Sequence, residues 1–250
     1  MAPRKPIKKQ KRKTRKQYGG SLPRCQCGSE CKRPVVKGDT FCTYHKENKC
    51  PIVSPLSGCE PSYEPELYNN DKSVQHSHNC FAYAMDVRDS VRITKCRDKN
   101  ECSTPQPGRK KGHPEFSGQM GKSCSDVISR TMADIPNAYV TNFTNKCEPG
   151  FSKIGAVVDE KNDYHYYRQD KNGWWSHKPG GRPVKNTDAN DAKIYRPDLA
   201  SREYLPEYEG DSGLNYNSFC SYMCVPRKNI QGVNPIQIAG KRTRKRRSSV

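Results

Sequence analysis

Two stretches of sequence decide the fold of this chain: residues 77–85, SHNCFAYAM, and residues 163–180, DYHYYRQDKNGWWSHKPG. The first has the pattern of a loop that enters a helix at Cys80. The second has two aromatic runs separated by Asn172 and Gly173, which is typical of a β-hairpin with a tight turn. We therefore expect an α+β fold in which a helix packs on a small antiparallel sheet.

Five further segments have a recognisable period or end signal. We expect a helix over 123–133, a buried strand over 154–158, a short strand over 192–195, a short helix over 197–204 and a strand over 219–225. In the last of these, strict alternation would place Phe219 and Met223 on the same face.

The order Cys80, His165, His177 predicts a site for nucleophilic chemistry, because it puts a thiol at a helix start and two imidazoles on consecutive strands. Unpaired N–H groups at a helix start stabilise a thiolate and can hold an oxyanion. His165 would carry the proton, and His177 would orient it, with Asp188 or Asp191 as alternatives. The competing interpretation is packing, with the thiol as a small buried hydrophobe and the histidines as hydrogen-bonded hairpin residues.

This set resembles the NlpC-type papain-like peptidases and amidases, whose third member is often a histidine. The motifs that carry the resemblance are NCFAYA (79–84), QPG (106–108), DYHYYRQ (163–169) and WSHKPG (175–180). They are also similar to segments of bacterial and large DNA virus proteins. In such viruses, small Cys-rich proteins with Lys/Arg-rich ends are often minor capsid or virion proteins. The resemblance covers residues 75–200 at most and implies a papain-like fold more firmly than an activity.

The segment 21–62 is rich in cysteine and turns and predicts a zinc-knuckle-like unit with structural zinc. Two close pairs of soft ligands, spaced C-x3-C-x10-C-x2-H, suit a tetrahedral metal. The expected ligands are Cys27, Cys31, Cys42 and His45. Cys25 can replace Cys27, and a disulfide-pinned loop is the alternative. Because no secretory signal is recognisable, we expect a reducing compartment, in which metal binding takes precedence over disulfides among the 13 cysteines.

The net charge of +19 is concentrated at the two ends of the 250 residues. Residues 1–20 hold nine lysines and arginines and no acid, and residues 241–250 hold six more. Without these fifteen charges the remaining chain carries only +4. Such tails bind acidic surfaces, unless they are solvated solubility tails. The expected organisation is a basic arm (1–20), a Cys-rich segment (21–62), a papain-like domain (63–226) and a basic C-terminal tail (227–250), with no transmembrane segment.

These features favour a virion structural protein, in which a papain-like domain serves as a minor capsid building block and the basic tails bind neighbouring capsid proteins. Its place would be the virion, assembled in the host cytoplasm or nucleus and not secreted. The first alternative is an active cysteine peptidase or amidase with a Cys-His-His triad. The second is a nucleic-acid-binding zinc protein whose tails contact phosphates.

Overall fold

The computed structural model describes residues 23–116, 122–206 and 213–227. The basic arm (1–20) and all of the basic C-terminal tail except Arg227 lie outside the described residues. None of the helices in the described ranges is both long and apolar enough to cross a membrane.

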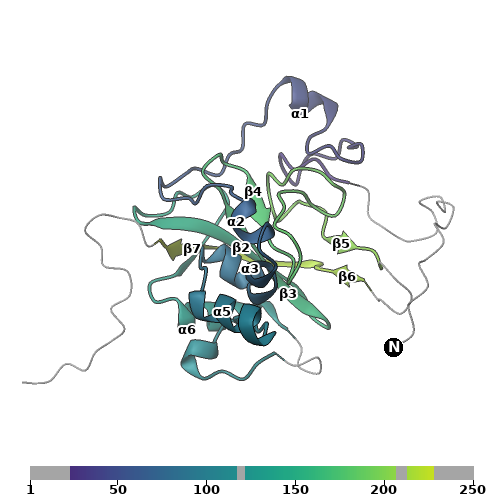
Figure 1. The fold of residues 1–250 in the computed structure, drawn as a ribbon. Helices are drawn as coiled ribbons and strands as arrows, with labels where there is room; N and C mark the ends of the chain where they lie inside the picture. The colour runs from purple at the N-terminus through teal and green to yellow at the C-terminus, as the bar shows by residue number, and fades with distance from the viewer. Residues whose placement is uncertain (1–22, 117–121, 207–212, 228–250) are drawn as a thin grey trace, which may run out of the picture.

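The centre of the domain is a five-stranded antiparallel sheet with strand order β1-β7-β2-β3-β4 (Figure 1). Its long strands are β2 (Phe151–Asp159), β3 (Asp163–Gln169) and β7 (Ser218–Pro226). The short edge strands are β1 (Tyr139–Thr141) and β4 (Trp175–His177). The buried strand and the hairpin expected from sequence are therefore confirmed as β2 and as the β3–β4 pair.

Short helices pack against one face of this sheet. The Cys-rich segment that contains α1, which we call the knuckle (residues 23–62), projects at the top of the view in Figure 1. The helices are α1 (Thr43–Glu47), α2 (Glu66–Asn69), α3 (Lys72–Ser77), α4 (Cys80–Ala84), α5 (Ser90–Lys99), the 3-10 turn η2 (Arg109–Lys111) and α6 (Cys124–Asp134). The expected helix over 123–133 is confirmed as α6, whose first turn is capped by Ser123 through a hydrogen bond from the Asp126 amide.

Two apolar clusters lie on the two faces of the sheet. On the helix face, Phe81 and Val127 pack against Ile154 and Tyr166. On the other face, Val157, Tyr167 and Trp175 of the strands pack against Phe143 and Ile194, which come from irregular loops. The alternation of side chains along β2 and β3 divides their residues between these clusters, since successive residues of a strand point to opposite faces.

Three local expectations are wrong. Residues 197–204 form no helix: one turn, with the Leu199 and Ala200 amides bonded to the Arg196 carbonyl, is followed by β5 (Glu203–Tyr204), which pairs with β6 (Leu214–Asn215). Residues 192–195 make isolated bridges instead of a strand. Phe219 and Met223 lie in different clusters, because a register shift between β2 and β7 interrupts the alternation.

Four disulfides cross-link the described chain. They join Cys27 to Cys50, Cys96 to Cys102, Cys124 to Cys220, and Cys147 to Cys224. The last two tie α6 and the loop after β1 to β7. The expectation that metal binding takes precedence over disulfides is therefore wrong for these eight cysteines, and the free thiols are Cys25, Cys31, Cys42, Cys59 and Cys80.

Candidate functional site

Cys80 is the first residue of α4, as predicted. The helix starts here because the side chain of Asn79 accepts a hydrogen bond from the Ala82 amide at 3.1 Å. The same side chain donates to the Pro105 carbonyl at 2.7 Å, which fixes the loop ahead of the helix. Local sequence therefore sets the position of the thiol at a helix N-terminus.

The thiol sits at an open edge of β3. Strand β4 pairs only with residues 167–169 of β3, so residues 163–166 have no strand neighbour on that side in the described chain. The Cys80 sulfur lies 4.0 Å from the Tyr164 carbonyl oxygen, beside the backbone that carries His165. The first residue of α4 thus contacts the part of β3 that β4 leaves unpaired.

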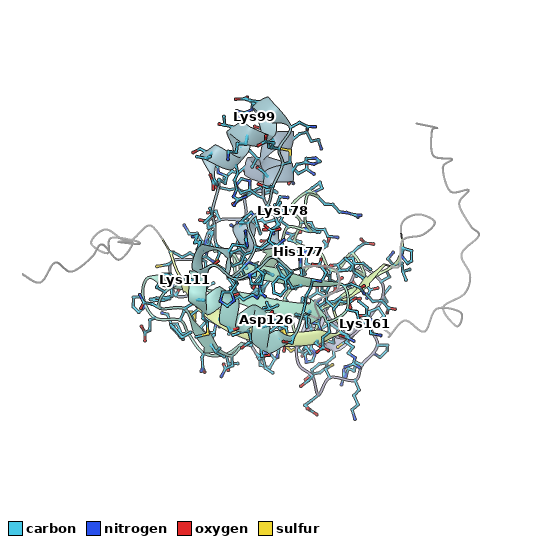
Figure 2. All side chains as sticks on the ribbon, turned by 90° about the horizontal axis from the view of Figure 1, so that it is seen from below. Lys99, Lys111, Asp126, Lys161, His177 and Lys178 are labelled. Carbon is cyan, nitrogen blue, oxygen red and sulfur yellow. A yellow bond between two sulfur atoms is a disulfide. The ribbon has the colours of Figure 1, made fainter. Side chains whose placement is uncertain are left out.

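His165 and His177 are in direct contact. His165 Nε2 lies 2.7 Å from His177 Nδ1, and His177 Nε2 lies 3.0 Å from the Thr187 carbonyl oxygen. A carbonyl oxygen only accepts, so His177 carries its proton on Nε2 and accepts on Nδ1. His165 must then donate from Nε2, which leaves its Nδ1 as a free base. His177 is buried, and Figure 2 labels it near the middle of the domain, whereas Lys99, the last residue of α5, lies at the margin.

The Cys80 thiol and His165 line one cavity, although their side chains belong to different faces of the sheet. By strand alternation His165 shares the face of Tyr167, whereas Tyr164 and Tyr166 share the face of α4. Cys80 and His165 nevertheless both line a cavity of about 340 Å³, whose wall also includes Asn79, Gln106, Lys122 and Asp163. Among the described residues no hydrogen bond joins the sulfur to His165. The structure therefore brings the two histidines into contact and places Cys80 in the wall of the cavity that His165 also lines.

Burial keeps all three groups uncharged. Cys80 is 5% exposed, His165 3% and His177 0%. Burial, with a smaller contribution from the Asp163 charge, raises the pKa of the Cys80 thiol to about 12. Burial also lowers the pKa of His165 well below its ordinary value and that of His177 to about 3. The resting state is thus a neutral thiol beside neutral imidazoles.

The two aspartates considered as orienting groups do not contact the histidines. The Asp188 carboxylate accepts from the backbone amides of Asn190, Ala192 and Ser201. Asp191 is exposed and pairs with Lys37 at 3.2 Å. Of the alternatives, His177 is the group that holds His165.

A second cluster of chemical groups lies in the N-terminal knuckle. Cys25, Cys31, Cys42 and His45 bring their ligand atoms within 4.8 Å of one another, an arrangement that can hold a metal ion. The His45 Nδ1 atom lies 3.2, 3.6 and 3.5 Å from the sulfurs of Cys25, Cys31 and Cys42, and the last two sulfurs are 3.8 Å apart. The Cys42 amide also donates to the Cys25 sulfur.

The structure corrects one member of the predicted ligand set. Cys27 is bonded to Cys50, so it has no thiolate to offer, and Cys25 takes its place. The three other predicted residues are in the cluster. The spacing around the first ligand is therefore C-x5-C, with the disulfide-bonded Cys27 inside the loop.

Two groups that shape the site could not be recognised from the sequence. The carbonyl of Thr187 fixes the tautomer of His177, and a backbone atom leaves no trace in residue type. Lys178 is fully buried, and its ammonium donates to the carbonyls of Gln75, Gly180 and Arg182, which closes the loop after β4. Burial lowers the pKa of Lys178 to about 8.

No protein-family model matches the chain, and no solved structure matches it significantly. Among curated proteins, it is similar to "Insoluble matrix shell protein 1" from Ruditapes philippinarum, with 29% identity over 157 residues. The alignment covers 62% of this chain and 91% of that relative.

Proposed function

We propose that this chain is a structural protein of an assembled protein shell, built on a papain-like domain. The observation that carries this proposal is the buried, uncharged state of Cys80, His165 and His177. Cys80, His165 and His177 are all buried, and the thiol pKa of about 12 keeps the sulfur protonated at neutral pH. A site that neither exposes nor ionises its nucleophile at rest suits a scaffold better than a peptidase.

The cross-links support the same role. A disulfide restricts the unfolded chain more when it closes a longer loop, and two of the four join residues 96 and 77 positions apart. Disulfides persist in oxidising surroundings, which include the surfaces of virions. The similar protein is named as a component of an insoluble matrix, which is also a structural role. The virion capsid is the shell that the sequence resemblance favours, with other capsid proteins as partners of the basic tails.

Cross-linking mass spectrometry on the native assembly tests this role. We expect cross-links from lysines of residues 1–20 to acidic segments of neighbouring proteins, at a copy number comparable to that of the other shell components. Recovery of the chain as a free monomer at trace copy number would contradict a structural role.

A cysteine amidase or peptidase is the second candidate, and the histidine pair favours it. In a papain-like mechanism, His165 Nδ1 would take the Cys80 proton while His177 holds Nε2 at 2.7 Å. The thiolate would then attack an amide carbonyl, and the N–H groups at the start of α4 would hold the oxyanion.

Thiol labelling decides whether that site is available. In a Cys59→Ser background, which removes a partly exposed free thiol, we expect Cys80 to react with iodoacetamide at least about 100-fold more slowly in the folded than in the unfolded chain, because only the thiolate reacts. Folded-state labelling of Cys80 as fast as in the unfolded chain would favour the enzyme.

We also propose that the knuckle metal is zinc. With Zn–S near 2.3 Å and Zn–N near 2.0–2.1 Å, an ideal tetrahedron places two sulfurs about 3.8 Å apart and a sulfur and a nitrogen about 3.5 Å apart. The observed separations are 3.8 Å between the sulfurs of Cys31 and Cys42, and 3.2–3.6 Å to His45 Nδ1. Three thiolates and one imidazole fill all four positions, so the metal would be structural.

Nucleic-acid binding stays a sequence expectation, since the tails that carry it lie outside the described residues.

A further inference from the structure

Gln26 occupies an unusually constrained position in the knuckle. It lies between Cys25, a member of the metal cluster, and Cys27, which is disulfide-bonded to Cys50. Its amide donates to the Thr40 carbonyl at 3.0 Å, and the residue is only 1% exposed. Its backbone is therefore flanked by a disulfide-bonded residue on one side and by a member of the metal cluster on the other.

The side chain of Gln26 reaches out of the knuckle to a loop more than 160 residues away. Its Nε2 donates to Asp188 Oδ2 at 3.2 Å. Its Oε1 accepts from the Tyr195 amide at 2.7 Å and the Arg196 amide at 3.1 Å. A buried carboxamide that makes three hydrogen bonds to one segment fixes that segment, because breaking them would leave buried polar groups unpaired.

The segment in question, residues 185–196, is a loop that folds back on the edge of β4; we call it the edge loop. Lys185 bridges to His177, Ile194 to Trp175, and Thr187 to Lys193 within the loop. The knuckle makes two further hydrogen bonds to the edge loop. Thr40 Oγ1 donates to the Lys193 carbonyl at 2.7 Å, and the Gly38 amide donates to the Asn190 carbonyl at 2.9 Å.

The edge loop supplies the atom that sets the state of the histidine pair. Thr187, next to Asp188, offers the carbonyl that accepts from His177 Nε2 at 3.0 Å. That bond fixes the His177 tautomer and, through it, the proton position on His165. A continuous series of contacts therefore runs from the metal cluster through Gln26 and the edge loop to the two imidazoles.

We propose that Gln26 is a positioning residue through which the occupied metal cluster holds the tautomer of the His177–His165 pair. The knuckle is then part of the histidine site and not an independent appendage. This inference concerns the geometry of the histidine pair and holds whether or not the site turns over, so its failure is separable from that of the proposed functions.

The test is 15N NMR of the histidine rings in the full chain with zinc bound. In wild type we expect a single His177 tautomer protonated on Nε2. Gln26→Met keeps the side-chain length but removes all three hydrogen bonds. We expect this variant to retain about one zinc per chain by elemental analysis. Its His177 should show both tautomers, with exchange of the Nε2 proton accelerated at least about tenfold.

The matched control is Lys37→Met, which removes an exposed ion pair between the knuckle and Asp191 of the same loop. It should leave the His177 signals unchanged. If Gln26→Met does not fold, the wild-type chain treated with a chelator provides the same test, with a folded domain and mixed His177 tautomers as the expected result. A single Nε2–H tautomer in folded Gln26→Met, or in the folded metal-free chain, would overturn the proposal.

Discussion

At the residue scale, hydrogen bonding sets the proton positions in the histidine pair, and burial sets its charge. Hydrogen bonds decide which nitrogen carries each proton, because the Thr187 carbonyl can only accept. Burial decides that neither ring gains a second proton, since a charged imidazole would lose its hydration. His165 and His177 thus contribute as neutral groups, and this has a measurable consequence for stability.

We predict that the free energy of unfolding falls as the pH falls from about 6.5. The folded pKa of His177, about 3, is below its ordinary 6.5, so the unfolded chain binds more protons in this window. The loss should approach about 1.4 kcal/mol per pH unit for each buried histidine below pH 6. Denaturant unfolding at pH 5.0–7.5 measures it.

His177→Asn keeps a donor and an acceptor but cannot titrate, so it should show a shallower pH dependence than wild type. His76→Asn, at an exposed position, is the control and should keep the wild-type slope. Equal slopes for wild type and His177→Asn would show that the buried ring does not cause the acid sensitivity.

The sequence was sufficient to predict which residues form the histidine site, but not which cysteine completes the metal cluster. Cys80 at a helix start and His165 and His177 on neighbouring strands follow from cap and turn signals. The choice between Cys25 and Cys27 did not, because both spacings suit a metal. It depends on a disulfide to Cys50, 23 residues away, which local pattern does not encode.

At the element scale, local signals predicted the regular pieces and failed where tertiary pairing prevailed. The α6 helix has a Ser123 cap and a clear apolar face, and it forms as expected. The Pro197 signal predicted a helix, but Asp198 instead pairs with Arg196 and accepts from Tyr222. The bulge in β7 was invisible in the sequence because one extra residue leaves the composition of a strand unchanged.

The knuckle gives the element-scale prediction. Cys25→Ser removes a ligand, so we expect loss of bound zinc and of the knuckle's cooperative unfolding, since metal binding supplies folding free energy to such a small unit. Cys27→Ser, the matched control, removes only the disulfide and should retain about one zinc per chain. Zinc content by elemental analysis decides; retention in Cys25→Ser together with loss in Cys27→Ser would restore the ligand set first expected from the sequence.

At the scale of the whole molecule, a cross-linked body is combined with two strongly basic ends. The described domain is held by four disulfides and a buried helix–sheet interface. The fifteen charges of residues 1–20 and 241–250 repel one another and have few apolar neighbours to bury. We therefore predict that the described domain provides the stability of the protein and that the basic tails attach it to neighbouring proteins.

The most direct test of a structural role measures how much of the chain is recovered in the assembled particle. It compares a variant without the Cys80 thiol with a variant without the basic tails. We predict wild-type recovery for Cys80→Ala. Recovery should be several-fold lower for a chain without residues 1–20 and 241–250, although its domain should melt at an unchanged temperature. The attachment of the wild-type chain should weaken with salt, because charges are screened over about 10 Å at 0.1 M. Lost recovery of Cys80→Ala, with full recovery of the chain without tails, would contradict the account and point to a working thiol enzyme.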